Sequence, residues 1–398
     1  MQPVFLVIGN PGNRRVDYFH QAVASHGGRI LLISYQQLLE QFNNIKHVLL
    51  DKLQAFDTNH LYIRIESPGE CPVVERKLIK LGAQINGIEL PERSIEHGRL
   101  YGVRYWYLGF IRLLTELNVL PSLASSCGKI AKFINPPNDI ALMFDKDACH
   151  KHLEQHAISV PNRLPQFDSY EALRDYMHRE RSLRVFIKLN HGSSASGVAA
   201  YETKPSGQRE QITTSMELCR TNKKIAFYNS LKIRRYRQQE DIQPIIQFLL
   251  DEGAHIERWV PKSQIEGHSY DLRVVTINGR AAHTVVRKSR NPLTNLHLGN
   301  QRGTLAELGW SSDVKQRVFN AVESVAATFP DTFYAGVDVM LTHRSQHPFI
   351  LEVNAFGDLL PGIKHQGYDT YSSQLIQLSR YALNNSSDWV ERAAGDFR

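Results

Sequence analysis

Short apolar runs and stretches of helical spacing alternate through the first 125 residues of the chain. The apolar runs lie at residues 4–8, 29–34 and 61–65. A Gly-Asn-Pro-Gly-Asn turn follows the first run, and apolar residues at helical spacing follow the turn. Strand, turn, helix and strand in this order are typical of parallel sheets with crossover helices. We therefore expect residues 1–125 to form a small α/β domain, without the G-x-G-x-x-G fingerprint of a dinucleotide site.

The remaining pattern mixes helices with strands. A stretch rich in Ser, Gly and Pro at 122–137 is interpreted as a domain boundary. Helical spacing predicts helices at 98–120, 138–157, 169–179, 241–253 and 313–329. Strand-like runs lie at 185–189, 198–201, 255–260, 272–277, 282–286, 335–340 and 349–353. The fold class expected for the whole chain is α/β, with α+β character in its C-terminal part.

Composition changes this picture little, apart from the charge. The 398 residues include 47 Lys and Arg and 40 Asp and Glu, which gives a formal net charge of +7. No uncharged apolar run reaches the length of about 18 residues that crosses a bilayer, and the N-terminus has no signal-peptide pattern. The four cysteines contain no C-x-x-C pair, which suits a reducing compartment. We therefore expect a cytoplasmic protein that does not bind membranes.

The excess charge is concentrated in one segment. Seven basic residues and no acidic ones lie between Arg220 and Arg237, so this run alone equals the net charge. Such runs occur in solvated surface loops, in nucleic-acid-binding surfaces and at sites for the phosphates of smaller ligands. No RRM, KH or helix-turn-helix signature accompanies the run, so nucleic-acid binding is kept only as an alternative function.

A glycine- and serine-rich loop is the first candidate site. It reads Lys188-Leu189-Asn190-His191-Gly192-Ser193-Ser194-Ala195-Ser196-Gly197-Val198. Small residues let backbone N–H groups surround an anion, and a lysine at the end of the preceding strand adds a positive charge. The loop is not a Walker A motif, because no Lys-[Ser/Thr] pair follows its last glycine. A phosphate-binding loop and a plain hairpin both fit this pattern.

Oxygen-bearing side chains on two expected strands form the second candidate. Glu352 and Asn354 are two residues apart, so they project to one face of their strand. Leu351 and Val353 are then expected to pack behind it. Asp338 lies on another strand-like run. Oxygen ligands on neighbouring strands suit Mg²⁺ together with substrate phosphates, and we therefore expect a metal site here.

Charged and amide residues between these two sites form the third candidate. They are Asp271-Leu272-Arg273, Arg287 and Asn295-Leu296-His297-Leu298-Gly299. Negative charge that develops on a transferred phosphoryl group needs such donors.

Taken in order, these motifs resemble the ATP-grasp superfamily, most closely its ribosomal-protein glutamate ligases and glutathione synthetase. The matching positions are Lys146, the loop 188–197, Glu257-Arg258-Trp259-Val260, Asp271-Leu272-Arg273, Asn295-Leu296-His297, Asp338 and Glu352-x-Asn354. The resemblance covers residues 138 to about 365. It implies a Rossmann-like pre-ATP-grasp domain at 1–125, followed by two ATP-grasp lobes at 138–260 and 261–385.

The resemblance also implies roles in nucleotide binding. Lys146 and Lys188 would hold the α- and β-phosphates of ATP, and the loop 192–197 would close over the β- and γ-phosphates. The hinge backbone of Glu257, Arg258, Trp259 and Val260 would meet the adenine. Glu266 is the candidate for the ribose contact.

The metal and phosphoryl roles follow in the same way. Asp338, Glu352 and Asn354 would bind one or two Mg²⁺ ions, with Mn²⁺ as an alternative. Arg273 and Asn295 would face the transferred phosphoryl group, and Arg287 would be a further catalytic cation.

The family reaction that this implies is a carboxylate–amine ligation through an acyl phosphate. The expected substrates are a small-molecule or peptide carboxylate and an amine. An acidic or phosphorylated substrate could be clamped by the basic run. A phosphotransferase of the same fold, whose product keeps the phosphoryl group, is the alternative.

Two departures from the family pattern lie where the acceptor usually approaches. Gly299-Asn300 replaces a Gly-Gly pair, and Asp358-Leu359-Leu360 is added before Pro361-Gly362. Elsewhere, His152 and His156 are four residues apart on an expected helix but lack a third ligand, so we expect surface histidines. Cys127 and Cys149 have no evident catalytic partner in the sequence.

Overall fold

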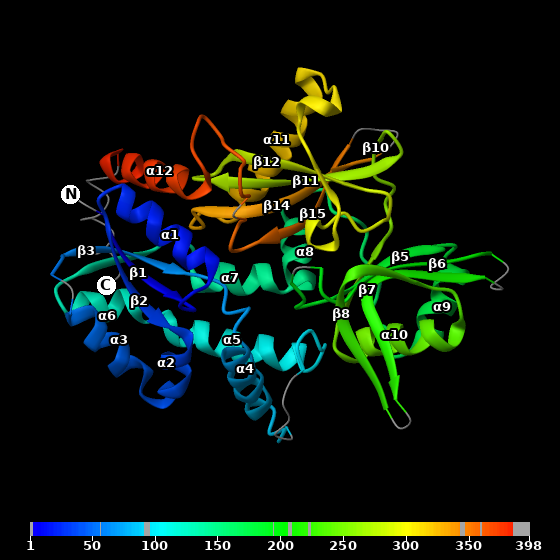
Figure 1. Cartoon of the computed structure of the whole chain (residues 1–398), viewed down its shortest axis with the longest axis horizontal. Helices are drawn as coiled ribbons and strands as arrows, with labels where there is room; N and C mark the ends of the chain where they lie inside the picture. Colours follow the sequence, from blue (N-terminus) through cyan, green and yellow to red (C-terminus); the bar gives the residue numbers. More distant parts are fainter. Residues whose placement is uncertain are drawn as a thin grey trace.

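Three sheets, with helices packed around them, organise the molecule (Figure 1). The computed structural model describes residues 3–55, 57–90, 96–193, 195–205, 209–221, 224–342, 347–358 and 360–384. None of the helices among these residues is long and apolar enough to cross a membrane.

The N-terminal part is built on a parallel sheet of order β2-β1-β3-β4. Its strands are β1 (Val4–Gly9), β2 (Arg29–Ser34), β3 (His60–Ile65) and β4 (Ile130–Phe133). The helices of this part are α1 (Arg14–Ser25), α2 (Tyr35–Glu40), α3 (Ile45–Gln54), α4 (Pro72–Ile85), α5 (Val103–Leu117) and α6 (Leu120–Ser126). Strands β1, β2 and β3 confirm the strands predicted from the apolar runs at 4–8, 29–34 and 61–65. The 122–137 stretch, expected to be a boundary, instead contains β4, which pairs with β3.

An antiparallel sheet of order β8-β7-β6-β5-β9 forms the lobe at the right of Figure 1. Its strands are β5 (Arg184–Leu189), β6 (Val198–Thr203), β7 (Glu210–Thr221), β8 (Lys224–Tyr236) and β9 (Ala254–Arg258). Helices α9 (Tyr170–Arg179) and α10 (Gln239–Asp251) share an apolar core with one face of this sheet. Side chains alternate along strands, so Val185, Ile187 and Leu189 enter that core while Phe186 and Lys188 point to the other face.

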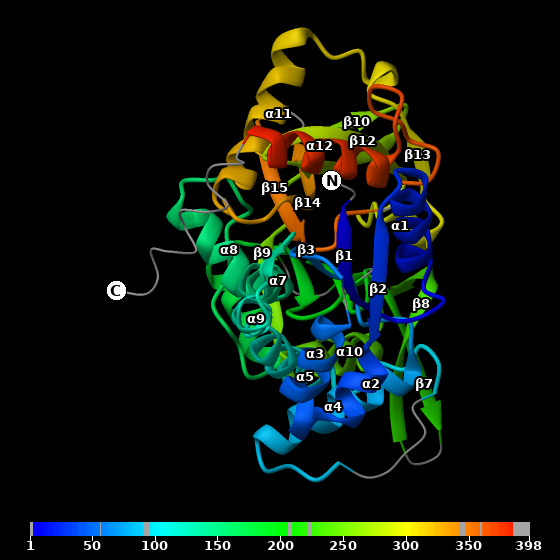
Figure 2. The same ribbon diagram turned by 90° about the vertical axis from the view of Figure 1, so that its left-hand side faces the viewer.

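A second antiparallel sheet has the order β13-β12-β11-β14-β15, and β10 pairs with β11. The strands are β10 (Gln264–Ile265), β11 (His268–Ile277), β12 (Arg280–Ser289), β13 (Gln301–Gly303), β14 (Tyr334–Leu341) and β15 (Pro348–Asn354). One face packs on α11 (Ser312–Ala327) in the main core. The other face packs on α12 (Thr370–Asn384) at one end, where α12 lies beside α1 (Figure 2). The opposite end of this face carries charged side chains.

The helix expected at 138–157 is two helices, α7 (Pro137–Phe144) and α8 (Lys146–Gln155). The break is at Asp145, whose Oδ1 accepts a hydrogen bond from the backbone N–H of Ala148 at 2.9 Å. Capping of this kind begins a new helix, which apolar spacing alone did not reveal. Because α8 begins at Lys146, residues at i, i+4 and i+7 lie on one face, and His150 and Leu153 are buried there.

Candidate active site

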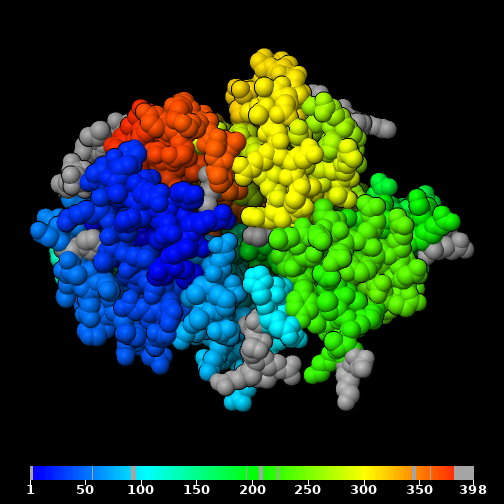
Figure 3. All heavy atoms as spheres, viewed as in Figure 1, coloured from blue at the N-terminus to red at the C-terminus, as the bar shows by residue number. Residues whose placement is uncertain are grey.

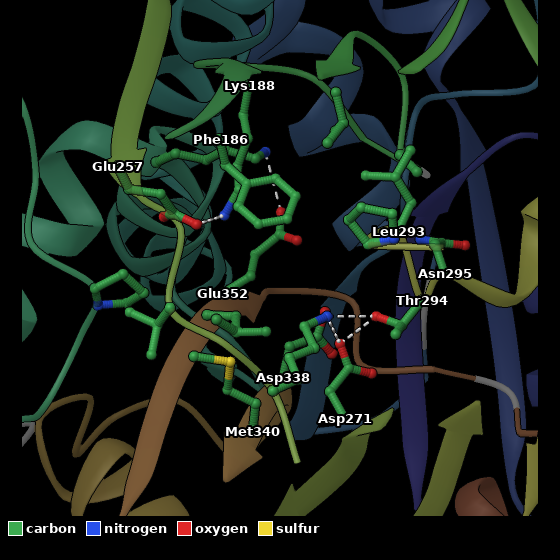
Figure 4. A pocket seen from close by; sticks show the side chains of 18 of the residues that line it. Phe186, Lys188, Glu257, Asp271, Leu293, Thr294, Asn295, Asp338, Met340 and Glu352 are labelled. Atoms are coloured by element: carbon green, nitrogen blue, oxygen red, sulfur yellow. Dashed lines mark hydrogen bonds and ion pairs between the residues drawn. The ribbon is translucent and has the colours of Figure 1, made fainter. Parts of the chain in front are cut away.

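A cleft lies between the two antiparallel sheets, where the green and yellow parts of the surface meet (Figure 3). It brings together residues that are far apart in the sequence. The expected site residues that line it are Lys146, Lys188, Gly192, Ala195, Ser196, Glu257, Arg258, Val260, Arg287, Asn295, Asp338 and Glu352. The carboxylate pair lies on one sheet, and Lys188 and Glu257 lie on the other (Figure 4).

Two lysines enter the cleft from different elements. Lys146, at the start of α8, places its Nζ 3.0 Å from Glu352 Oε1 and donates to the Gly192 carbonyl oxygen at 2.5 Å. Lys188, near the end of β5, places its Nζ 2.5 Å from Glu257 Oε1. Burial alone would raise the pKa of Glu257, but Lys188 and His255 lower it to about 2. Each lysine therefore lies against a carboxylate that holds its side chain in the cleft.

The two carboxylates expected to bind metal are direct neighbours. Asp338 on β14 is paired in register with Glu352 on β15, and Asn354 is opposite Gly336. Burial opposes the ionisation of Glu352, but Lys146 and Lys188 lower its pKa below the ordinary value. Asn354 lies next to the cleft rather than in its lining, and its Nδ2 donates to the Gly336 carbonyl oxygen at 3.2 Å.

The prediction that Leu351 packs behind the strand is wrong. The ladder between β14 and β15 shifts register between Asp338 and Val339, so Glu352 pairs with Asp338 while Ile350 pairs with Val339. Leu351 is the extra residue of this bulge and lines the cleft. A bulge reverses the alternation locally, whereas Val353 is buried as expected.

Two arginines bind carboxylates at the base of the cleft. Arg273 donates to Asp338 from Nε and, at 3.1 Å, from Nη2, and Arg287 Nη2 lies 3.1 Å from the same carboxylate. Arg287 Nε also donates to Asp271 Oδ1 at 2.7 Å. Arg287 lines the cleft, as expected for a cation near a phosphoryl group. Arg273 is not among the lining residues, because it lies behind Asp338 and also reaches Asp358 at 3.6 Å.

Asp271 is the centre of a buried network that the sequence did not indicate. Its Oδ2 accepts from Lys262 Nζ at 2.8 Å and from the Thr294 hydroxyl group. The side chain is 1% exposed. Burial opposes the charge, but Arg287 and Lys262 hold the pKa of Asp271 well below its usual range. Lys262 and Thr294 line the cleft and were missed, because a single lysine or threonine carries no motif.

The hinge is only partly as expected. Glu257, Arg258 and Val260 line the cleft. Trp259 does not, because its backbone N–H donates to the Arg184 carbonyl oxygen at 3.2 Å and its ring packs on Phe186 at 5.2 Å between centroids. Phe186 and Met340 supply apolar walls on opposite sheets (Figure 4).

The ribose candidate Glu266 lies outside the cleft. It is exposed, with a φ of 49°, in the turn that joins β10 to β11. The loose spacing between Glu266 and the hinge did not reveal that Glu266 lies in the turn of the β10–β11 hairpin.

The glycine-rich loop folds back on itself at the mouth of the cleft. Gly192, Ala195 and Ser196 line it, and the Ser196 backbone N–H donates to the Ser193 carbonyl oxygen at 2.8 Å. Gly197 has a φ of +62°, and a Cβ there would lie 2.2 Å from a methyl group of Leu189. Glycine is therefore required where the loop enters β6. Ser194 lies outside the described residues.

One departure from the ATP-grasp pattern, Asn300 in place of a glycine, lies in the loop that carries Asn295. Asn300 Nδ2 donates to the carbonyl oxygens of Leu293 and Asn295, at 2.7 and 2.9 Å. Asn295 Oδ1 accepts from the backbone N–H of His297 at 2.9 Å. Asn300, where the family has glycine, thus fixes the loop that presents Leu293, Thr294 and Asn295 to the cleft (Figure 4).

The basic run forms β8 and the end of β7. Arg220 lies 2.8 Å from Asp241, and Arg234 lies 2.5 Å from Glu217. Arg235 points from the other side of β8 and donates to Asn291 Oδ1 at 3.2 Å. Ile233, on the side of Arg235, packs in the small apolar cluster that contains Leu293. The Arg235 side of β8 is therefore the one that turns toward the cleft.

Comparisons with known proteins concern the fold. No protein-family model matches the sequence, and no curated protein matches it significantly. One similar structure is that of the ATP-grasp ligase PsnB complexed with a phosphomimetic variant of minimal precursor, Mg and ADP. It is 13% identical to this chain with a TM-score of 0.50, and the match covers 96% of this chain and 99% of that chain. D-cycloserine synthetase DcsG is 14% identical with a TM-score of 0.51, and the match covers 94% of this chain and 99% of that chain. With the motifs in the expected order around one cleft, the chain has the fold of the ATP-grasp superfamily.

Proposed function

We propose that the protein is an ATP- and Mg²⁺-dependent ligase that joins a carboxylate to an amine. The observation that carries the proposal is the meeting of Asp338 and Glu352, in register on one sheet, with Lys146 and Lys188 in one cleft. Paired carboxylates facing two ammonium groups suit a nucleotide whose phosphates need both a divalent cation and fixed positive charge. PsnB, which shares the fold, has been solved with Mg and ADP.

Lys146 and Lys188 are assigned to the phosphates of ATP. Their present partners are the carboxylates of Glu352 and Glu257, so neither charge is buried without compensation. Backbone groups of the loop that contains Ala195 and Ser196 would cover the phosphates. The adenine would lie between Phe186 and Met340, against the hinge at 257–260.

The donor set at Asp338 and Glu352 fits Mg²⁺. Two carboxylates on adjacent strands supply hard oxygen ligands, and the Oδ1 of Asn354 is a third oxygen on the same side of β15. Arg273 holds the Asp338 carboxylate from behind and is therefore assigned a positioning role. When bound, Mg²⁺ neutralises phosphate charge and aligns the transfer.

The proposed reaction is the one that the resemblance to ATP-grasp ligases implies. An oxygen of the substrate carboxylate attacks the γ-phosphorus, and the bond from the γ-phosphorus to the bridging oxygen of ADP breaks. Arg287 and Asn295 would donate to the oxygens of the phosphoryl group as charge develops there. The amine nitrogen then attacks the acyl carbon, phosphate leaves with the electrons of the C–O bond, and the nitrogen loses a proton. The closed loop keeps water from the acyl phosphate.

The side of β8 that turns toward the cleft is assigned to the acceptor. Arg235 is the cation on that side, and its partner Asn291 is neutral. Arg234 is already neutralised by Glu217. An acidic or phosphorylated acceptor would therefore meet Arg235 rather than Arg234.

Hydroxylamine trapping tests the proposed function. The protein, Mg·ATP and a pool of amino acids and short peptides are incubated with hydroxylamine, which replaces the amine. We expect ADP, free phosphate and a hydroxamate that mass spectrometry identifies. A phosphorylated product without hydroxamate would indicate the phosphotransferase instead, and failure to bind Mg·ATP would contradict both.

A further inference from the structure

Beside the cleft, three buried side chains converge on one point. His150 comes from α8, and His255 and Glu257 come from the same face of β9. One ring nitrogen of each histidine and one carboxylate oxygen all lie within 4.8 Å of one another. The three residues are 5%, 2% and 2% exposed. It is the one such group of three or more His, Cys, Asp or Glu side chains among the described residues.

The histidines have too few partners for their burial. Neither ring nitrogen of His150 has a hydrogen-bond partner among the described residues, and Nδ1 of His255 has none of good geometry. Buried polar atoms are almost always satisfied, and leaving them unsatisfied costs free energy. The unsatisfied nitrogens of His150 therefore indicate room for a ligand, whereas Nε2 of His255 already has Glu257 Oε2 as a partner.

The geometry around the rings is that of metal-binding histidines. Nδ1 of His255 lies 3.5 Å from Asp147 Oδ1, and Nδ1 of His150 lies 3.7 Å from Glu154 Oε1. Histidines that bind metal through one nitrogen usually face a carboxylate with the other. This leaves Nε2 of each ring for an ion.

The carboxylate is placed to complete the set. Glu257 Oε2 is 3.2 Å from His255 Nε2, close to the separation of about 3.3 Å between two ligands on a tetrahedral ion with bonds of about 2.0 Å. The other oxygen, Oε1, accepts from Lys188, so Oε2, whose present partner is the His255 ring, is the oxygen that would bind an ion in place of that contact. A small cavity lined by Cys149, His150 and His255 adjoins the group, so a fourth ligand has room.

We propose that His150, His255 and Glu257 bind a divalent transition-metal ion, with Zn²⁺ as the best match. Two imidazoles and a carboxylate are Zn²⁺ ligands, whereas Mg²⁺ prefers oxygen ligands alone. Its ligands differ from the carboxylate pair assigned to Mg²⁺, although Glu257 also lines the cleft and Glu352 also lines the adjoining cavity. The metal proposal does not depend on the proposed ligase function.

Metal titration of the full-length chain tests the site. The protein is stripped with a chelator, and Zn²⁺ alone is added while binding is followed by calorimetry. We expect one equivalent to bind, to resist an excess of Mg²⁺, and to be replaceable by Co²⁺ with a visible spectrum of tetrahedral type. His150→Gln and His255→Gln should each weaken binding by at least about 100-fold, since each removes a ligand.

Neighbouring histidines on the same helix supply the control. His152 Nε2 donates to the Thr328 carbonyl oxygen at 3.1 Å, and His156 Nδ1 donates to the His152 carbonyl oxygen at 2.8 Å. His152→Gln and His156→Gln should leave Zn²⁺ affinity unchanged. If the His150 and His255 variants do not fold, Glu154→Gln, at an exposed position, should still weaken binding by about 10-fold.

Three results would overturn the site. The first is the absence of stoichiometric Zn²⁺ binding by the stripped wild-type chain. The second is loss of binding in the His152 or His156 variants with retention in the His150 variant. The third is displacement of Zn²⁺ by millimolar Mg²⁺.

Discussion

The cleft and the β7–β8 hairpin both concentrate cations, but they hold them in different ways. In the cleft, Arg287 is buried and bridges Asp271 and Asp338. On the hairpin, the side chains of Arg220 and Arg234 are 46% and 39% exposed, and each has one partly exposed carboxylate as partner. The segment that dominates the net charge of the chain is thus the one with the weaker interactions.

Burial and close pairing of charges, and not charge density, therefore mark the site. Exposed ion pairs contribute little to stability because water and salt screen them. Buried charges are costly to desolvate and need good partners. A cluster of buried charges that opens onto a cleft is consistent with a site where a charged ligand exchanges for protein partners. The following predictions test this comparison.

The largest effect is expected for Asp271→Ala. It leaves Lys262 buried without a carboxylate and Arg287 with Asp338 alone. Loss of one partner of a buried pair is strongly destabilising, and we expect the free energy of unfolding to fall by about 3 kcal/mol. Urea denaturation followed by tryptophan fluorescence measures it. Asp241→Ala, which removes the exposed partner of Arg220, is the control, and equal losses in both variants would contradict the comparison.

The next effect is expected for Lys188→Ala on nucleotide binding. A hydrogen bond to a charged group contributes about 1.5–3 kcal/mol, so Mg·ATP should bind about 10- to 100-fold more weakly. Glu257 keeps His255 as a partner, so the fold should persist. Lys151→Ala, on the exposed side of α8, should leave the affinity unchanged. The affinity of both variants for Mg·ATP is measured by calorimetric titration. An unaltered affinity in Lys188→Ala would contradict the assignment of Lys188 to the phosphates.

The smallest effect is expected on KM for the acceptor, and it should differ between variants on the two sides of β8. Arg235→Gln should raise KM for an anionic acceptor about 3- to 5-fold and leave kcat unchanged, as expected for lost uniform binding. Arg234→Gln should change neither, because that cation is committed to Glu217. The acceptor is the carboxylate identified by hydroxamate formation. Equal KM values for Arg235→Gln and the wild type would contradict a role of Arg235 in acceptor binding and indicate that the basic run is a solvated surface.

The sequence was sufficient for the fold class and most of the cleft. Period-2 runs and turn residues located the central strands, and the i, i+2 spacing of Glu352 and Asn354 predicted that they share a face. The order of the motifs along the chain indicated ATP-grasp, and the fold comparisons support it. These local patterns can be recognised in the sequence without knowledge of how the strands pair.

The errors concern features that only the three-dimensional arrangement determines. A bulge turned Leu351 into the cleft, and capping by Asp145 divided one expected helix into two. Arg273 was expected at the phosphoryl group, but it holds Asp338 from behind. The pairing of Lys262 with Asp271 depends on a loop returning to a strand. No sequence spacing reports such contacts.

The melting temperature in the presence of ATP, with and without Mg²⁺, tests the central claim most directly. Ligand at about 100 times its Kd stabilises the folded state by about 2.7 kcal/mol. We predict a clear rise in melting temperature with ATP and Mg²⁺ together, little with either alone, and loss of the rise in Glu352→Gln. Glu202→Gln, at a partly exposed residue on β6 that does not line the cleft, should keep it. An unchanged melting temperature with Mg·ATP, or an equal rise in Glu352→Gln, would contradict the account.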